Sequence, residues 1–491
     1  MLVLVLTAGT LVAVAARAEW LRGLGAADWA AIKFTLTQAF VSAAISVILG
    51  IPVARALARR QFRGRKVLIT LLGAPFLLPV MVAVVGLLAV FGRGGILNAA
   101  LGALGFETMS IYGFHGVVLA HVFFNLPLAV RLILQGWLAI PAERFRLAAS
   151  LGAPVGRLLE WPMLRTVVPS TFLVIFLICL TSFAVALTLG GGPKSTTVEL
   201  AIYQALRFDF DLGRAALLAC FQFGLCVLAA VLAWRLTGID AMGAGLDRVV
   251  TRWDVRRAGF DYALIAGATL FLLLPLGMVI WRGLPALIVL PSTVWVAALR
   301  SVIVACASAA LCCAMAIGLG LWGGRIVAVM GVLPLAASSL VVGTGAFLIV
   351  YPYFNPSDLA LLITMLVNAT LALPFVLRAI DPAIASVQAN FAHLGASVGL
   401  TGWRWVWIVV LPRIRRPLGF GAGLAAALSM GDLGVITLFA DQSNETLPLA
   451  MYRLMGAYKM DAAAGAAVLL LALSFLMFWI CDQGGRRDVD L

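Results

Sequence analysis

The segment closest to a catalytic motif is GGGPKST, from Gly190 to Thr196, and it fails as a phosphate-binding loop. Such a loop needs G-x-x-x-x-G-K-[ST], in which glycine backbone N–H groups hold the phosphates and the lysine contacts the terminal ones. Here Pro193 directly precedes Lys194, and Thr188 stands where the first glycine should be. We therefore expect that this chain hydrolyses no nucleotide itself, and we interpret the segment as an outer turn.

Side chains that commonly bind metals are scattered along the chain. His115, His121 and His393 have no ligand spacing, and the seven cysteines lie in or at the ends of apolar stretches without any C-x-x-C pair. We expect the cysteines to pack between helices. The sequence predicts neither a metal site nor a cofactor.

Asp432 is the most informative single residue, because it lies inside the apolar stretch 418–440. A carboxylate within a membrane is costly unless it faces a cavity or a partner. Two interpretations stay open: Asp432 lines a route for a cationic solute, or it holds a bend marked by Gly431 and Gly434. These three residues, with Ser182 in the corresponding segment of the first half, are our candidates for a translocation path or gate.

Composition decides which elements position these residues. A chain of 491 residues that is 63% hydrophobic and 11% charged, with mean hydropathy +1.08, is too apolar for a soluble protein. Apolar runs long enough to cross ~30 Å of hydrocarbon recur about twelve times. We place them at 2–17, 34–57, 68–91, 113–135, 167–189, 215–235, 262–281, 296–320, 328–351, 358–379, 418–440 and 462–481. Each must be helical in lipid, so the predicted fold is an all-α polytopic membrane protein.

The net charge of +14 is explained by membrane orientation. If the N-terminus is cytoplasmic, the basic residues concentrate on the inner side, as the positive-inside rule requires. The densest clusters are Arg55, Arg59, Arg60, Arg63, Arg65 and Lys66, and then Arg248, Arg252, Arg256 and Arg257. We therefore expect both termini in the cytoplasm, contact with the lipid bilayer, and no nucleic-acid partner.

The first apolar stretch ends in A-R-A before Glu19, which resembles a signal-peptide cleavage site. It lacks the basic segment that normally begins a secretory signal. We expect it to remain as a membrane helix.

The chain carries the same long loop twice, which indicates a tandem duplication. The first copy reads RLAASLGAPVGRLLEWPMLR and the second HLGASVGLTGWRWVWIVVLP. Upstream, NLPLAVRLI corresponds to ALPFVLRAI, and Tyr203 corresponds to Tyr452. Six helices repeated in parallel orientation give these predicted regions: 1–30, N-terminal membrane helix and outer loop; 31–236, first repeat; 237–261, cytoplasmic basic linker; 262–295, connecting helix and outer loop; 296–482, second repeat; 483–491, cytoplasmic tail.

Two kinds of transporter fit such a parallel duplication. An ion-coupled secondary transporter moves its halves around a central site, whereas a primary transporter is driven by separate ATPases. The first kind predicts coupling carboxylates or histidines in both halves. When the two halves of the sequence are aligned, however, the counterpart of Asp432 is Phe183, which is not acidic. The duplicated loops, each with small residues before a basic amphipathic stretch, favour docking to an external motor over an interfacial helix on lipid.

The two loops resemble the EAA loop of ABC importer permeases, whose pattern is E-A-A-x-x-x-G followed later by L-P. The second copy keeps Gly399 and Leu411-Pro412, and the first keeps Ala148 and Gly152. Arg146 and His393 replace the glutamate of the family, and the first copy has Leu164-Arg165 in place of L-P. The resemblance implies a type I ABC importer permease fold, in which each loop forms a coupling helix that inserts into an ATPase subunit.

Within that family the chain resembles the fused permeases of bacterial thiamine importers. The resemblance is carried by AHVFFNLPLAVRLILQ, GGGPKSTTVELAIYQAL, GDLGVITLF and TLPLAMYRLMGAY. It implies import of thiamine and its phosphate esters across the inner membrane, with two copies of a cytoplasmic ATPase and a periplasmic thiamine-binding protein as partners. Fused ferric-iron permeases share the architecture, so iron or another small solute stays open as an alternative.

The resemblance also assigns residues to surfaces. The expected coupling-loop residues are Arg146, Ala148, Ala149, Gly152, Glu160, Trp161, His393, Ala396, Gly399, Leu411 and Pro412. The expected contacts of the binding protein are Lys194, Glu199, Tyr203, Glu445 and Tyr452.

Overall fold

The computed structural model describes residues 2–73, 78–236, 258–323, 334 and 337–486, and these residues form helices joined by short loops. No strand occurs within these ranges. The helices of the N-terminal part are α1 (Leu2–Leu4), α2 (Thr10–Arg17), α3 (Ala26–Arg59), α4 (Arg65–Leu71), α5 (Val80–Phe91), α6 (Ile96–Ala103), α7 (Phe114–Leu138), α8 (Ala142–Ser150), α9 (Trp161–Leu180), α10 (Ala184–Leu189), α11 (Val198–Arg207) and α12 (Leu212–Leu236).

The C-terminal part follows the same order. Its helices are α13 (Ala258–Ala286), α14 (Ser292–Trp322), α16 (Ser339–Val350), α17 (Ala360–Ser397), α18 (Gly402–Trp405), α19 (Leu411–Met430), α20 (Gly434–Phe439), α21 (Leu447–Gly456) and α22 (Met460–Arg486). Most of the predicted basic linker, including Arg248 to Arg257, and the last residues of the predicted tail lie outside the described residues.

The prediction of an all-α polytopic membrane protein is confirmed. In the described ranges, ten helices are long and apolar enough to cross a membrane, and Val5–Arg17 and Ser339–Val350 are shorter apolar helices. Two of the predicted spans are not single helices in the structure, because each contains a break. The span 167–189 is divided between α9 and α10, and the span 418–440 is divided between α19 and α20.

Matching hydrogen bonds relate the two parts of the chain. The N–H of Val198, which begins α11, donates to the Thr35 hydroxyl of α3 at 2.9 Å. The N–H of Leu447, which begins α21, donates to the Ser301 hydroxyl of α14 at 2.8 Å. The first residues of α11 and α21 are thus held in the same way, each by a backbone N–H that donates to a hydroxyl of a long helix.

Helix α2, which precedes the first repeat, packs against a helix of the second repeat, and α13, which precedes the second repeat, packs against a helix of the first. Helix α2 contacts α12 and α16, whereas α13 contacts α22 and α5. Glycines make both crossings possible: a Cβ on Gly345 of α16 would collide with the Thr10 carbonyl oxygen, and a Cβ on Gly86 of α5 would collide with that of Pro275. Small residues at such crossings let helix backbones approach closely in lipid.

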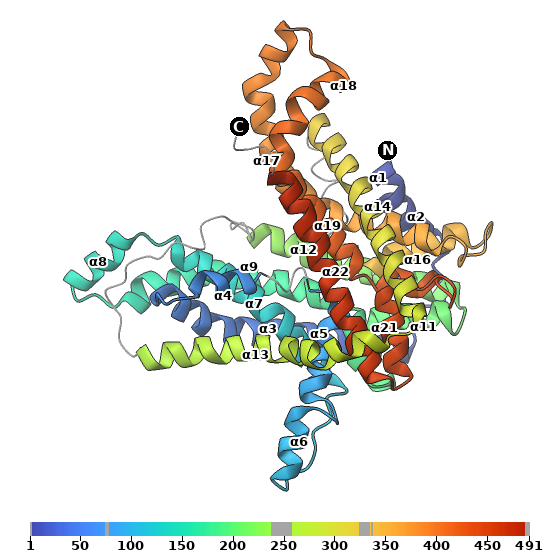
Figure 1. The fold of residues 1–491 in the computed structure, drawn as a ribbon, viewed down its shortest axis with the longest axis horizontal. Helices are drawn as coiled ribbons and strands as arrows, with labels where there is room; N and C mark the ends of the chain where they lie inside the picture. The colour runs from blue at the N-terminus through green and yellow to red at the C-terminus, as the bar shows by residue number, and fades with distance from the viewer. Residues whose placement is uncertain (1, 74–77, 237–257, 324–333, 335–336, 487–491) are drawn as a thin grey trace.

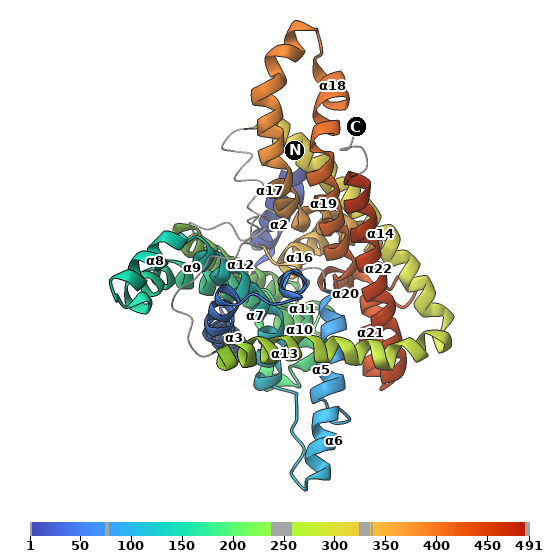
Figure 2. The same cartoon turned by 60° about the vertical axis from the view of Figure 1, so that its left-hand side comes forward.

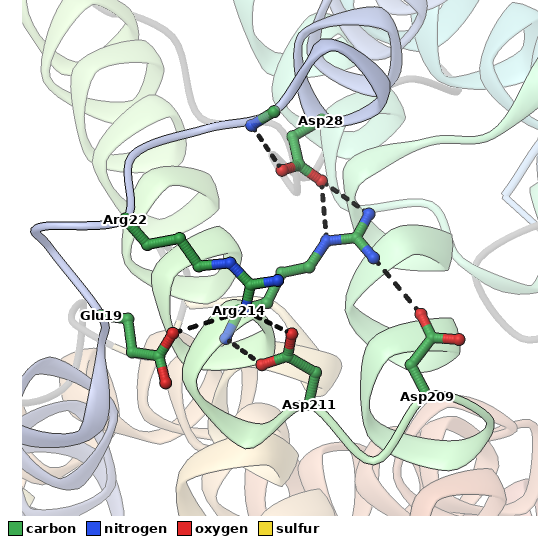
Figure 3. A network of polar contacts seen from close by, with 7 residues as sticks. Glu19, Arg22, Asp28, Asp209, Asp211 and Arg214 are labelled. Carbon is green, nitrogen blue, oxygen red and sulfur yellow. Dashed lines mark hydrogen bonds and ion pairs between the residues drawn. The ribbon is translucent and has the colours of Figure 1, made fainter.

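Ion pairs connect the loop after α2 to the beginnings of α3 and α12 (Figure 3). Arg22 pairs with Asp211 at 2.6 Å, and Arg214 pairs with Asp28 at 2.7 Å and with Asp209 at 3.3 Å. Asp28 also accepts the Gly25 N–H at 2.9 Å. The network therefore fixes where the chain enters α3.

Candidate functional site

Two helical arms project from the body, and both duplicated loops lie on them. The first arm (residues 139–160) contains α8, and the second arm (residues 388–410) contains the end of α17 and α18 (Figure 1, Figure 2). Pro141 directly precedes α8 in the first arm, whereas Gln388 lies in the middle of α17. The first arm therefore begins with a new helix after Pro141, whereas the second begins as a continuation of α17 up to Ser397.

The helix of each arm ends in the same turn. Gly152 has φ +61° and Gly399 has φ +72°, so both adopt the left-handed conformation that glycine favours. The Ala153 N–H donates to the Ala148 carbonyl, and the Leu400 N–H donates to the Gly395 carbonyl, each at 2.8 Å. This pattern is the Schellman motif, which satisfies the last helix carbonyls and turns the chain back.

Each arm exposes a pair of apolar side chains one helical turn apart. In the first arm Leu147 is 59% exposed and Leu151 is 71% exposed. In the second arm Leu394 is 61% exposed and Val398 is 68% exposed. Each arm therefore presents one matched apolar pair near its end. The sequence comparison missed these residues, although their signal is present: the same apolar types recur at the same places in both loops.

The predicted coupling-loop residues divide into an outer and an inner group. Exposed residues are Arg146, Ala149, Gly152, Trp161, His393, Ala396, Gly399 and Pro412. Ala148 points inward in the first arm, and its counterpart Gly395 lies against the Trp405 ring, which leaves no room for a Cβ. The small residues of the motif therefore serve contacts within the arm as well as its outer surface.

The return to the membrane is also built twice. A π-helical turn, Gly156–Glu160 or Val406–Val410, leads into α9 or α19. The next two residues are Trp161-Pro162 in α9 and Leu411-Pro412 in α19. The structure thus places Trp161-Pro162, rather than Leu164-Arg165, at the position of the family L-P pair.

Glu160 is not on the outer surface of its arm. Its side chain is 6% exposed and lies 2.5 Å from Arg55 and 3.8 Å from Arg59, both on α3. The Trp137 indole N–H also donates to it at 3.4 Å. Glu160 therefore joins the first arm to the end of α3, and its buried carboxylate is not accessible to a docked protein in this conformation.

A cavity of about 230 Å³ lies between the predicted halves at the break before α20. It is lined by Leu78, Pro79 and Val80 from the first half, and by Asn368, Leu371, Ala372, Phe375, Ala427, Leu428, Ser429, Gly431 and Asp432 from the second. Asp432 Oδ1 accepts the Gly434 N–H at 3.2 Å, whereas Oδ2 has no hydrogen-bond partner. Of the four expected path residues, Gly431 and Asp432 line this cavity, whereas Gly434 and Ser182 are not among its lining residues. Asp432 lies between two helices instead of inside one.

The glycines beside Asp432 allow close contact with other elements. The Cβ position of Gly431 is 3.2 Å from Pro79, and a Cβ on Gly434 would collide with the Ser339 hydroxyl. In the first half, Ser182 lies two residues after the end of α9 and two before α10, as Asp432 does between α19 and α20. The structure therefore pairs Asp432 with Ser182, and the comparison with Phe183 was wrong by one residue because the outer loops differ in length.

A chain of hydrogen bonds connects two of the polar lining residues, Asn368 and Ser429, to neighbouring helices. The Asn368 amide donates to the Ser429 hydroxyl at 3.1 Å, and Ser429 donates to the Ser308 hydroxyl at 3.2 Å. Ser308 lies on α14 and donates to the Met365 carbonyl of α17 at 3.1 Å. Three helices are connected in this way around the break, a link that no spacing in the sequence indicates.

The residues expected to contact a binding protein lie at different depths. Lys194 is exposed, and Glu445 pairs with Arg453 at 2.7 Å. Burial raises the pKa of Tyr452, and the electrostatic influence of Tyr203, its counterpart in the first half, raises it further.

Glu199 is fully buried, and Tyr203 is 9% exposed and packs against Phe183 with ring centroids 5.5 Å apart. Neither side chain is free to meet a docked protein in this conformation. In the described part of the chain, no group of three His, Cys, Asp or Glu side chains is arranged to hold a metal ion.

The chain is similar to curated permeases over most of its length. It is 39% identical to the thiamine transport system permease protein ThiP of Escherichia coli K12, with 94% of this chain and 90% of that protein covered. The proteins of the same name from Brucella abortus (strain 2308) and Haemophilus influenzae are 36% and 35% identical, each with 94% of this chain and 89% of the relative covered. No protein-family model matches the chain. On the strength of these relatives, the chain belongs to the family of thiamine transport system permease proteins.

Proposed function

We propose that this chain is the membrane permease of an ABC importer that carries thiamine and its phosphate esters into the bacterial cytoplasm. Similarity to thiamine permeases over 94% of the chain carries this proposal. The proposed location is the inner membrane, with both termini in the cytoplasm. The regions 31–236 and 296–482 would be the two permease repeats.

The paired arms support an external source of energy. Each arm offers one apolar pair on a glycine-terminated helix, and two such surfaces fit two copies of one ATPase subunit. When ATP brings the two subunits together, the arms move with them, and the helices that follow each arm transmit this motion to the breaks before α10 and α20. Substrate transfer then shifts the balance between inward-open and outward-open states only through contacts that differ between them.

The outer surface supports docking of a periplasmic binding protein. Lys194 and Glu445 lie in loops at the ends of α10 and α20, away from both arms. Tyr203 and Tyr452 lie on α11 and α21, the helices that follow these loops. A loaded binding protein would cover this opening and release its substrate towards the cavity beside Asp432.

The proposal is tested by uptake of labelled thiamine in a strain that lacks its own importer. Cells that express this chain with its ATPase and binding protein should accumulate thiamine, and cells without the ATPase should not. Affinity purification of the chain should recover the ATPase at two copies per permease. Accumulation without the ATPase, or purification without it, would contradict the proposal.

A further inference from the structure

The cavity contains the Asp432 carboxyl group, which has no basic partner among the described residues. Among the described residues, no lysine or arginine lies within ion-pair distance of the Asp432 carboxylate. One carboxylate oxygen is used by the Gly434 N–H, and the other is unpaired. A carboxylate at membrane depth without a partner is costly, which is typical of residues that meet a charged ligand.

The remaining lining indicates what kind of cation would fit. Apart from Asp432, Asn368 and Ser429, the cavity is lined by apolar side chains, among them the aromatic ring of Phe375. Hard metal ions require six or more oxygen ligands and keep bound water. A flat organic cation needs only one opposite charge, and it gains from contact with apolar and aromatic surfaces.

The charge belongs to one half only. At the corresponding break, the first half has Ser182, which carries no charge. The first half also contributes only Leu78, Pro79 and Val80 to the cavity, all apolar. A ligand there would be bound through the second half and covered by the first.

We propose that the cavity between the start of α5, α17 and α19 binds a positively charged heteroaromatic ring of the transported solute, with the Asp432 carboxylate as its charge partner. This inference rests on the proposed function, because the thiazolium ring of thiamine carries such a charge. It adds that the permease itself, and not only its binding protein, selects for the cation.

The competing explanation is that Asp432 only holds the turn before α20, and one substitution separates the two. Asp432→Asn keeps an oxygen that can accept the Gly434 N–H but removes the charge. Its matched control is Asp441→Asn, since Asp441 also accepts backbone N–H groups in a turn, from Ser443 at 2.9 Å and Asn444 at 3.2 Å, but on the outer surface.

The experiment measures uptake of thiamine and of an isosteric analogue with an uncharged five-membered ring, by cells containing the complete importer. For each variant, the rate of thiamine uptake is divided by the rate of analogue uptake. This ratio is then divided by the ratio of the affinities of the binding protein for the two compounds, and the result is the preference of the permease for the cation. We expect Asp432→Asn to lower this preference for the cation about tenfold, which corresponds to about 1.4 kcal/mol. Asp432→Glu, which keeps the charge, and Asp441→Asn should retain the preference of the wild type.

An unchanged preference in Asp432→Asn, at normal protein level, would overturn the inference and leave the turn as the function of this residue. If that variant does not assemble, Phe375→Leu decides, because it leaves the turn intact and should lower the preference about threefold; an unchanged ratio there would also overturn the inference. The proposed function is judged separately. It fails if wild-type cells take up no thiamine, and it stands if they do while the preference ignores Asp432.

Discussion

Replacing Gly399 by alanine tests whether the left-handed turn positions the exposed pair of the second arm. At φ +72° an alanine Cβ crowds its own backbone, which costs about 1–2 kcal/mol. No other atom lies within 4 Å of that Cβ position, so this strain is the whole expected cost. A penalty of this size lowers the ratio of correctly folded to misfolded arm end by a factor of about 5–30. Gly152 has the same geometry, so its replacement should have the same effect on the first arm.

The assay is ATP hydrolysis by the complete importer in nanodiscs, titrated with the ATPase subunit. We expect Gly399→Ala to weaken assembly by up to about 30-fold, the largest change in that ratio, and the double variant with Gly152→Ala to weaken it multiplicatively. Gly399→Asn should recover much of the loss, because asparagine tolerates the left-handed region. The control is Gly318→Ala, within α14 and also free of neighbouring atoms, which should assemble normally. If Gly399→Ala behaves like this control, the arm turn does not set the docking surface.

Three further perturbations test other parts of the account. Exchanging Leu147 and Leu394 for serine should weaken ATPase binding by about 1.5–3 kcal/mol per arm, the value of one buried leucine side chain. If either single variant binds the ATPase subunit as tightly as the wild type in the same titration, this prediction is wrong. Glu160→Gln should lower the stability of the detergent-solubilised chain by about 3 kcal/mol, at the low end for a broken buried pair because one arginine partner is partly exposed, and an unaltered thermal unfolding midpoint would refute it. Gly345→Val should force α2 away from α16, since the Thr10 carbonyl occupies the space of the added side chain, and disulfide crosslinking between cysteines placed on these two helices should fall; persistent crosslinking would be the contrary result.

Several features of the fold were predictable because they follow from local physics. Hydropathy located the long helices, since lipid demands continuous apolar stretches with paired backbones. The repeated glycines were recognisable as loop markers, and the structure explains them: Gly152 and Gly399 both need positive φ. Hydropathy did not place the breaks before α10 and α20, because single polar residues such as Ser182 and Asp432 barely lower the average over a long apolar stretch, although Gly431 and Gly434 did indicate a bend at the second.

Other features depended on contacts that the sequence does not reveal. Glu160 lies in a polar loop and looked accessible, yet Arg55, far earlier in the chain, buries it in an ion pair. The sequence singles out Asp432 as a carboxylate within an apolar stretch, but it does not show the cavity, which depends on Pro79 and Phe375 from distant segments. The match of Trp161-Pro162 with Leu411-Pro412 was missed because the loops that precede them differ in length.

The central claim is that energy enters this permease through its two arms from an ATPase outside the membrane. The most direct test reconstitutes the chain in liposomes, with and without the ATPase, and supplies loaded binding protein to the outer surface. The account predicts accumulation of thiamine against its gradient only when the ATPase and ATP are enclosed. Accumulation by the chain alone, driven by a proton or sodium gradient, would contradict it.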